Sequence, residues 1–338
     1  MCALGGILAG LLRSPLGTQV ASRTLLLMVD IHSHVVWGVD DGSPSEDVSI
    51  AMLEAAAAAG TTDIVASPHA DEKYTYDPAL IDSRIASLND KLGGRIRIHR
   101  GCDFHLSFEN VQAALTEPQR FSIAGGRYIL VEFPDFFGSS AGDNALGKLL
   151  ERGLVPVITH PERNPTIQAS PDKLKPWIEH GCKVQVTAGA LLGNFGRTAH
   201  RCVHRLIQES MVHIAASDAH DPVRRHARLD EARRDTAQRY GETFADALFT
   251  DNPAKVLRDE EIGLAPRPAH VPPGRTPGPR APTSGHGVGG VCEDHHSWRN
   301  CTSSRARWTR VRAPWPCRPT TTTPRADGSG RSSSPATG

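Results

Sequence analysis

Residues 28–60 read MVDIHSHVVWGVDDGSPSEDVSIAMLEAAAAAG, and they contain the clearest strand and helix pattern of the chain. A short apolar segment leads into a polar loop, and an alanine-rich run at 51–59 follows. Because alanine has the highest helix propensity, we predict a strand followed by a helix. The predicted helix boundaries are Ser43 as N-cap, Pro44 as first helical residue, Glu46 closing a capping box, and Gly60 just past the end.

This unit is the first of seven similar strand–helix units between residues 28 and 264. The predicted strands are 29–32, 63–67, 95–100, 128–133, 154–159, 183–188 and 212–217. Further helices are predicted at 78–92, 142–152, 171–180, 195–210 and 227–249. Seven β/α units predict a parallel α/β fold, either a closed barrel or an open doubly wound sheet. In both folds the functional residues lie at the carboxyl ends of the strands.

The composition and the charge distribution limit which classes of protein the chain can belong to. Of the 338 residues, 39% are hydrophobic and 22% are charged, which fits a soluble globular protein with a polar extension. The net charge of +1 is unevenly distributed, because residues 265–338 carry +8 and residues 1–27 carry +2. Residues 28–264 therefore carry about −9, which argues against nonspecific nucleic-acid binding by this part of the chain.

The two ends of the chain lack the pattern of the middle. Residues 265–338 hold 12 of the 25 prolines, and we interpret them as a disordered or misread Pro/Arg/Thr-rich tail. Residues 1–27 form an N-terminal extension with no assigned structure, and Met28 is a plausible alternative start. The chain has seven cysteines, no CxxC pair and no apolar run of transmembrane length. These features predict free thiols, no transmembrane segment and a cytoplasmic location.

Metal-binding side-chain types follow six of the seven predicted strands. The candidates are His32, His34, Asp40 and Asp41 after the first strand, His69 after the second, Asp103 after the third, Glu132 after the fourth, His160 after the fifth, and Asp218 and His220 after the last. Imidazoles and carboxylates without thiolates suit Mn, Fe or Zn. Their number predicts two or three ions that share a bridging carboxylate. Six other histidines do not fit this pattern and are interpreted as surface or core residues: His99, His105, His180, His200, His204 and His213.

The motifs DIHSHVVWGVDDG, ASPHA, GCDFH, LVEFP, THPER and SDAH occur in this order. In this order they resemble the PHP (polymerase and histidinol phosphatase) superfamily. The segments VDDG, HPERN and QVTAGALLGNFG make the chain similar to the bacterial manganese-dependent tyrosine-protein phosphatases of the CpsB/YwqE type. The resemblance covers about residues 28–258.

The resemblance implies a fold and a set of site residues. The fold is a PHP-type distorted (β/α)7 barrel, with residues 28–264 as a single domain. The implied metal ligands are His32, His34, Asp41, His69, Asp103, Glu132, His160, Asp218 and His220. Asp41 is preferred over Asp40 by its spacing from His34, and Asp103 stands where the family often has Glu. Arg163 and Arg225 match phosphate-holding positions, with Arg224 as a substitute for Arg225.

The implied activity is that of a manganese-dependent protein-tyrosine phosphatase. A hydroxide bridging two ions would attack phosphorus, with His220 or a metal-bound water as the proton donor if one is needed. The implied partner is a bacterial tyrosine autokinase involved in capsule or exopolysaccharide synthesis.

Three alternatives remain from the sequence. The first is a PHP phosphatase for a small phosphomonoester such as histidinol phosphate. The second is a non-catalytic PHP-like scaffold. The third is a cysteine phosphatase, since Cys301 and Arg307 form a nominal Cys-x5-Arg match, although no apolar strand precedes it.

Overall fold

The fold is known from a computed structural model that describes residues 27–134 and 139–267. The described residues belong to one compact unit. Residues 1–26 of the predicted extension and 268–338 of the predicted tail, Cys301 included, lie outside the described residues. Among the described helices, none is both long enough and apolar enough to cross a membrane.

The described strands form two sheets in which every pairing is parallel. The first sheet has the order β1 (Met28–Ser33), β2 (Thr61–Ala66) and β4 (Arg97–Arg100). The second has the order β3 (His69–Ala70), β5 (Asp103–His105), β6 (Tyr128–Glu132), β7 (Val155–Thr159), β8 (Lys183–Thr187) and β9 (Ile214–Ala216). All seven predicted strands are confirmed, with shifted ends. The very short strands β3 and β5 were not predicted.

The first and last strands lie next to each other. An isolated parallel bridge joins Ser33 to Ala219. The amide of Asp218 donates to the carbonyl of His32 at 2.8 Å, and the amide of His34 donates to the carbonyl of Ala219 at 2.8 Å. The carboxyl end of β1 and the loop after β9 are therefore held side by side.

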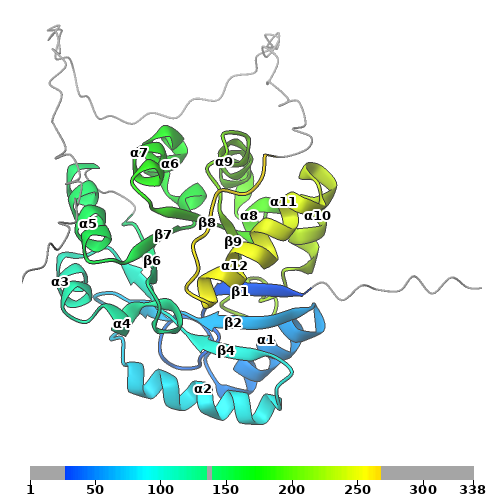
Figure 1. Ribbon diagram of the computed structural model, residues 1–338. Coiled ribbons are helices and arrows are strands. Elements are labelled where there is room, and N and C mark those ends of the chain that lie inside the picture. The colour runs from blue at the N-terminus through cyan, green and yellow to red at the C-terminus, as the bar shows by residue number, and fades with distance from the viewer. Residues whose placement is uncertain (1–26, 135–138, 268–338) are drawn as a thin grey trace, which may run out of the picture. The chain divides into compact units, whose positions relative to one another are not determined.

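Helices surround the strands in Figure 1. The longer ones are α1 (Glu46–Ala58), α2 (Pro78–Leu92), α3 (Phe108–Thr116), α5 (Ser139–Glu151), α9 (Gly196–Gln208) and α10 (Asp230–Tyr240). The shorter ones are α4 (Pro118–Phe121), η1 (Ile123–Gly125), η2 (Pro161–Arg163), α6 (Pro165–Ala169), η3 (Pro171–Lys173), α7 (Leu174–Glu179), α8 (Ala188–Leu191), α11 (Glu242–Asp246), η4 (Ala247–Asp251) and α12 (Asn252–Leu257). The prediction for 78–92 is confirmed, whereas the predicted helix at 227–249 is interrupted at Gly241, whose φ is 98°.

The predicted start of the first helix is wrong by two residues. The N-cap is Ser45, whose hydroxyl accepts from the amide of Val48. Ser43 is instead bound into the preceding loop, because its amide donates to the carbonyl of His34 at 3.1 Å. Glu46 does not close a capping box, since its carboxylate accepts from Ser87 at 2.8 Å.

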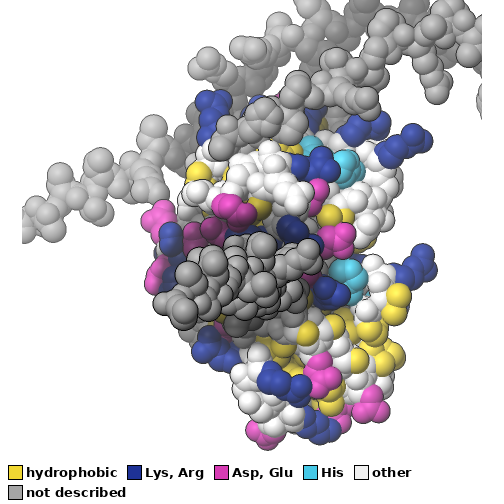
Figure 2. All heavy atoms as spheres, turned by 90° about the vertical axis from the view of Figure 1, so that its right-hand side faces the viewer, with side chains coloured by type: hydrophobic (Ala, Val, Ile, Leu, Met, Phe, Trp, Pro, Cys, Tyr) yellow, Lys and Arg dark blue, Asp and Glu magenta, His cyan; other side chains and the backbone are white. Residues whose placement is uncertain are grey.

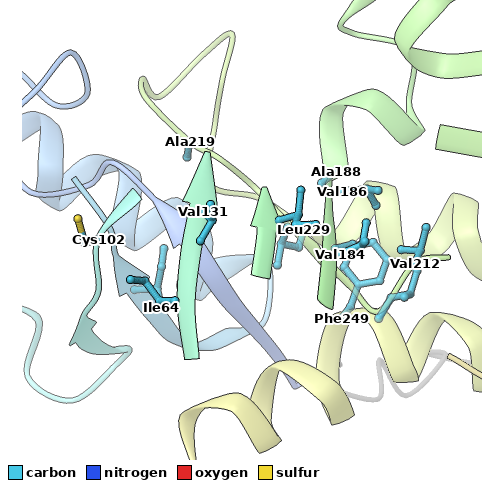
Figure 3. Packing of buried hydrophobic residues seen from close by; sticks show 14 of the residues in the cluster. Ile64, Cys102, Val131, Val184, Val186, Ala188, Val212, Ala219, Leu229 and Phe249 are labelled. Carbon is cyan, nitrogen blue, oxygen red and sulfur yellow. The ribbon is translucent and has the colours of Figure 1, made fainter. Parts of the chain in front are cut away.

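Alternate strand residues face two different apolar clusters. An inner cluster contains Val29 of β1, Leu130 of β6, Val157 of β7, and Ile214 and Ala216 of β9. The strand residues that alternate with these point to the opposite face and pack with helix residues in a larger apolar cluster. Figure 3 shows part of the larger cluster, in which Val184 of β8 lies near Phe249.

The inward-facing positions become polar at the carboxyl ends of the strands. Two residues after Leu130 comes Glu132, and two residues after Ala216 comes Asp218. Because side chains alternate along β6, Glu132 continues its inner face, and the turn after β9 brings Asp218 to the same end of the strands. The inside is therefore apolar along the strands and polar at their carboxyl ends.

The chain after α12 packs beneath the inner cluster. Ile262 belongs to this cluster and is 1% exposed. The hydroxyl of Tyr128 donates to the carbonyl of Glu260 at 2.6 Å, and the amide of Arg127 donates to the carboxylate of Asp259 at 2.8 Å. Residues 259–262 are thus fastened to the start of β6.

Figure 2 shows one face of the protein. Lys and Arg side chains (dark blue) and Asp and Glu side chains (magenta) are interspersed on its visible part. Nonspecific nucleic-acid binding requires a continuous basic surface, and the visible part of this face does not form one.

Acidification should destabilise the protein through His213, which precedes β9. Its Nδ1 accepts from the amide of Val184 at 3.1 Å, and burial lowers its pKa to about 3. Because the unfolded chain protonates this group at its ordinary pKa of about 6.5, stability falls as the pH drops below that value. Linkage gives a loss of about 2 kcal/mol by pH 5.

We expect His213→Asn, which keeps an acceptor for Val184, to show a shallower loss of stability between pH 7.5 and 5. Urea unfolding at several pH values measures this slope. Equal slopes for the variant and the original chain would refute the prediction.

Candidate metal centre

The nine predicted metal ligands converge at the carboxyl ends of the strands. His32 and His34 come from β1 and the residues after it, His69 from β3, Asp103 from β5, and Glu132 from β6; Asp41, His160, Asp218 and His220 come from loops after β1, β7 and β9. Their ligand atoms form four sets within 4.8 Å of one another: His34, Asp41, His69 and His220; His32, His34 and Asp103; His32, His160 and Asp218; and His69, Asp103 and Glu132. Four residues belong to two sets each, so the sets form one connected centre.

The distances fit ligands of shared cations better than hydrogen bonds. The Nε2 atoms of His32 and His34 are 3.3 Å apart and lie 3.5 and 3.4 Å from Oδ1 of Asp218. Hydrogen bonds from nitrogen to oxygen are usually about 2.7–3.2 Å long. Two atoms bound about 2.1 Å from one ion at ordinary coordination angles lie about 3.0–3.5 Å apart.

Buried polar atoms without hydrogen bonds support the same interpretation. Oδ2 of Asp103 and Nδ1 of His69 are buried and form no hydrogen bond, although they lie only 3.3 Å apart. An unpaired buried polar group costs free energy, and such groups are rare. A cation between these donors would satisfy both of them. The donor set of imidazoles and carboxylates suits Mn, Fe or Zn.

The charges of the centre shift its pKa values strongly. Burial alone would lower the pKa of His32, but the nearby Asp103 and Asp218 outweigh this effect and raise the pKa to about 9. Burial alone would raise the pKa of Asp103, but His32 and His69 outweigh this effect and hold the pKa well below its usual range. Burial and the neighbouring His34 lower the pKa of His220 to about 2. The buried carboxylates of the centre therefore depend on nearby positive charge.

His32 and His34 reach the same centre through an irregular strand. Ile31 belongs to the inner apolar cluster, yet the adjacent His32 also contributes to the centre. The register of β1 against β2 shifts between Asp30 and Ser33. Such an irregularity re-aims side chains, as β-bulges beside active sites do.

Two further residues orient the histidines. Oε1 of Gln185 accepts from Nδ1 of His32 at 2.9 Å, and Oδ2 of Asp40 accepts from Nδ1 of His34 at 2.6 Å. Each bond leaves the Nε2 lone pair facing the centre. Gln185 lies on β8, the strand to which the sequence assigned no site residue. A glutamine among valines in KVQVT was the signal that could have found it.

The structure places Asp40 and Asp41 differently. Oδ1 of Asp41 lies 3.4 Å from Nε2 of His69 and 3.5 Å from Nε2 of His220. Asp40 lies behind His34 and also accepts from the amide of His69 at 3.1 Å. Gly42 lets the loop approach closely, because a Cβ there would be 2.2 Å from the carbonyl oxygen of His34.

The backbone is strained at two of the candidate ligands. His160 has a φ of 34° and Asp218 a φ of 51°, both in the left-handed region. Such conformations cost about 1–3 kcal/mol and persist where the surroundings enforce them, often at functional sites.

Two guanidinium groups lie beside the centre. Arg163 and Arg225 both donate to Oδ2 of Asp218, Arg225 at 2.6 Å. Both guanidinium carbons also lie over the ring of Phe195, at 4.7 and 5.9 Å from its centroid. Arg224 makes neither contact and lines a different cavity.

An open cavity of about 450 Å³ gives access to the centre and is lined by candidate ligands together with Arg163 and Arg225. Lys73, Tyr74 and His105 also line it, although no motif in the sequence marks them as site residues. His105, predicted as a surface or core residue, is partly exposed, and its Nδ1 lies 3.8 Å from Oε2 of Glu132.

Comparisons with known proteins agree with the geometry. A family model described as capsular polysaccharide synthesis, CpsB/CapC, matches residues 28–258. The tyrosine-protein phosphatase YwqE of Bacillus subtilis is 31% identical over 71% of this chain and 95% of its own length. The putative tyrosine-protein phosphatase CapC of Staphylococcus aureus is 32% identical over 57% of this chain and 77% of its own length.

A solved structure is also similar. It belongs to a study of YwqE from Bacillus subtilis and CpsB from Streptococcus pneumoniae, described as metal-dependent tyrosine phosphatases. The match has a TM-score of 0.67 and 31% identity, and it covers 72% of this chain and all of the other.

The hydrogen bond from His32 to Gln185 gives a prediction about metal affinity. We expect Gln185→Met to weaken manganese binding by about tenfold or more, because partners that orient a ligating histidine contribute this much. Calorimetric titration of the chelator-treated protein measures the affinity. Gln112→Met on exposed α3 is the matched control. An unchanged affinity in Gln185→Met would show that this bond does not orient a ligand.

Proposed function

The chain belongs to the CpsB/CapC family of capsular polysaccharide synthesis, and from this premise we propose that it is a metal-dependent protein-tyrosine phosphatase. The observation that carries the proposal is the connected set of imidazole and carboxylate donors with two guanidinium groups at its edge. Relatives named tyrosine-protein phosphatases and a related metal-dependent structure support it.

The nine candidate ligands would hold two or three ions, with manganese as our proposed metal. Bound cations would activate water and neutralise the charge of a phosphate ester. Asp103, which belongs to two of the donor sets, is suited to a position between ions. Gln185 and Asp40 would keep His32 and His34 in the tautomer that presents Nε2.

Arg163 and Arg225 would hold the phosphate oxygens. In this structure both guanidinium groups donate to Asp218, which is also a candidate ligand. If cations occupy Asp218, the two guanidinium groups become available for an incoming phosphate. Guanidinium groups bind phosphate oxygens through paired charge-assisted hydrogen bonds. Their stacking on Phe195 keeps both groups at the entrance.

The leaving group needs little protonation. A tyrosinate has a pKa of about 10, so it leaves more readily than an alkoxide. Nδ1 of His220 donates to the carbonyl of Asp218 at 3.1 Å, which leaves Nε2 to face the centre. We therefore assign His220 as a ligand rather than as a proton donor, because an Nε2 that holds a cation carries no proton.

Thiol chemistry by the described cysteines is disfavoured. Cys102, Cys182 and Cys202 are buried, and burial raises the pKa of Cys182 and of Cys202 to about 12. A thiol nucleophile requires a lowered pKa and access to substrate.

We also infer that the two sheets form one irregular barrel with seven strand positions. β2 and β3 would share one position, because only Ser67 and Pro68 separate them, and β4 and β5 would share another. The bridge between Ser33 and Ala219 supports closure between the first and last positions. The partner we propose is a tyrosine autokinase of capsule or exopolysaccharide synthesis.

Metal removal tests the proposed chemistry. We expect the full chain to lose hydrolysis of a phosphotyrosyl peptide after chelation and to regain it with Mn²⁺. Cys301→Ser should behave like the original chain, and phosphate release measures both. Activity that ignores the chelator and disappears in Cys301→Ser would favour thiol chemistry. Activity restored only towards histidinol phosphate would favour a small phosphomonoester as substrate.

Neutralising an arginine tests phosphate binding. We expect Arg163→Gln to lower kcat/KM by about 100-fold or more, as the loss of one preorganised donor to a developing charge does. Arg201→Gln, an exposed position on α9, is the control and should retain activity. Similar kinetics for the two variants would remove Arg163 from the mechanism.

A further inference from the structure

A second cavity, of about 300 Å³, adjoins the metal centre. Arg225 lines both this cavity and the one that opens onto the centre. Phe195, over which Arg225 lies, also borders the second cavity. One layer of side chains therefore separates the two spaces.

The second cavity presents basic groups that are available for a ligand. Within the described part of the chain, no carboxylate lies within ion-pair distance of the exposed Arg224. Nδ1 of His226 accepts from the amide of Arg228 at 3.3 Å. Its Nε2 therefore carries the proton and can donate to an anion.

The acidic group in the same cavity is already engaged. The carboxylate of Asp221 accepts from the amides of Val223, Arg224 and Arg225 at 2.8, 2.6 and 3.1 Å. These bonds hold the turn that carries Arg224 and Arg225, and they stabilise the negative charge of Asp221. Arg228 is paired with Asp230 at 3.1 Å, so it contributes less to ligand binding than Arg224 does.

We propose that the second cavity binds the acidic side chain of a residue close to the phosphotyrosine in the substrate. The inference rests on the proposed function and specifies its substrate class. The carboxylate would contact the guanidinium of Arg224 and Nε2 of His226, while the phosphate lies on the other side of Arg225. An extended peptide advances about 3.3 Å per residue, so a neighbouring side chain can reach across one layer of side chains.

Kinetics on matched peptides test the subsite. Each peptide carries one phosphotyrosine and either Glu or Gln at a single position, from three residues before it to three residues after it. We expect Glu to raise kcat/KM about tenfold over Gln at one or more positions, as charge-assisted hydrogen bonds are stronger than neutral ones. Arg224→Gln should lower this Glu/Gln ratio towards one, mainly through KM.

The control is Arg258→Gln, which removes the same charge at the end of α12 and should keep the ratio. Arg224 is exposed and forms no side-chain ion pair with the residues that the structure describes, and circular dichroism checks that both variants fold. A ratio near one in the original chain, or a ratio that survives Arg224→Gln, would overturn the subsite alone. No hydrolysis of any peptide with Mn²⁺ present would instead overturn the proposed function.

Discussion

The burial of two carboxylates, Asp103 and Asp218, is the constraint on which the rest of this end of the protein depends. Both are almost completely inaccessible to water, and an isolated buried charge is very unfavourable. The structure surrounds them with imidazoles, and it adds Arg163 and Arg225 at Asp218. The arrangement is stable only if positive charge is present, whether from protons, guanidinium groups or cations. Metal cations bound here would supply this positive charge and could also activate water.

The inner face of the strands has two parts, an apolar one along the strands and a polar one at their carboxyl ends. Along most of their length they present valine, leucine and isoleucine, which form a rigid apolar support. At their carboxyl ends the same face presents candidate ligands on β1, β3, β5 and β6, and the loops after β1, β7 and β9 supply the others.

Much of this centre could be predicted from the sequence, because parallel strands bring their carboxyl ends together and the ligand types follow those ends. Local spacing did not predict the residues that act through a distant partner. Gln185 contacts His32 across 153 positions, and only the fold brings them together. The place of His105 beside Glu132 was not predicted, because the three-residue strand β5 that carries it is too short to show a pattern. Ser43 looked like a helix cap, but its bond to His34 belongs to the loop and outweighs local preference.

The segment 259–262 beneath the inner cluster supports the fold although it lies beyond the family match. The family match ends at residue 258, yet Ile262 fills the floor of the interior and Glu260 receives the hydroxyl of Tyr128. A chain cut at the family boundary would keep every candidate ligand and expose the apolar layer on which those ligands stand. Water entering from below would then loosen the support of a centre at the opposite end of the strands. Folding therefore depends on residues that lie beyond the end of the family match.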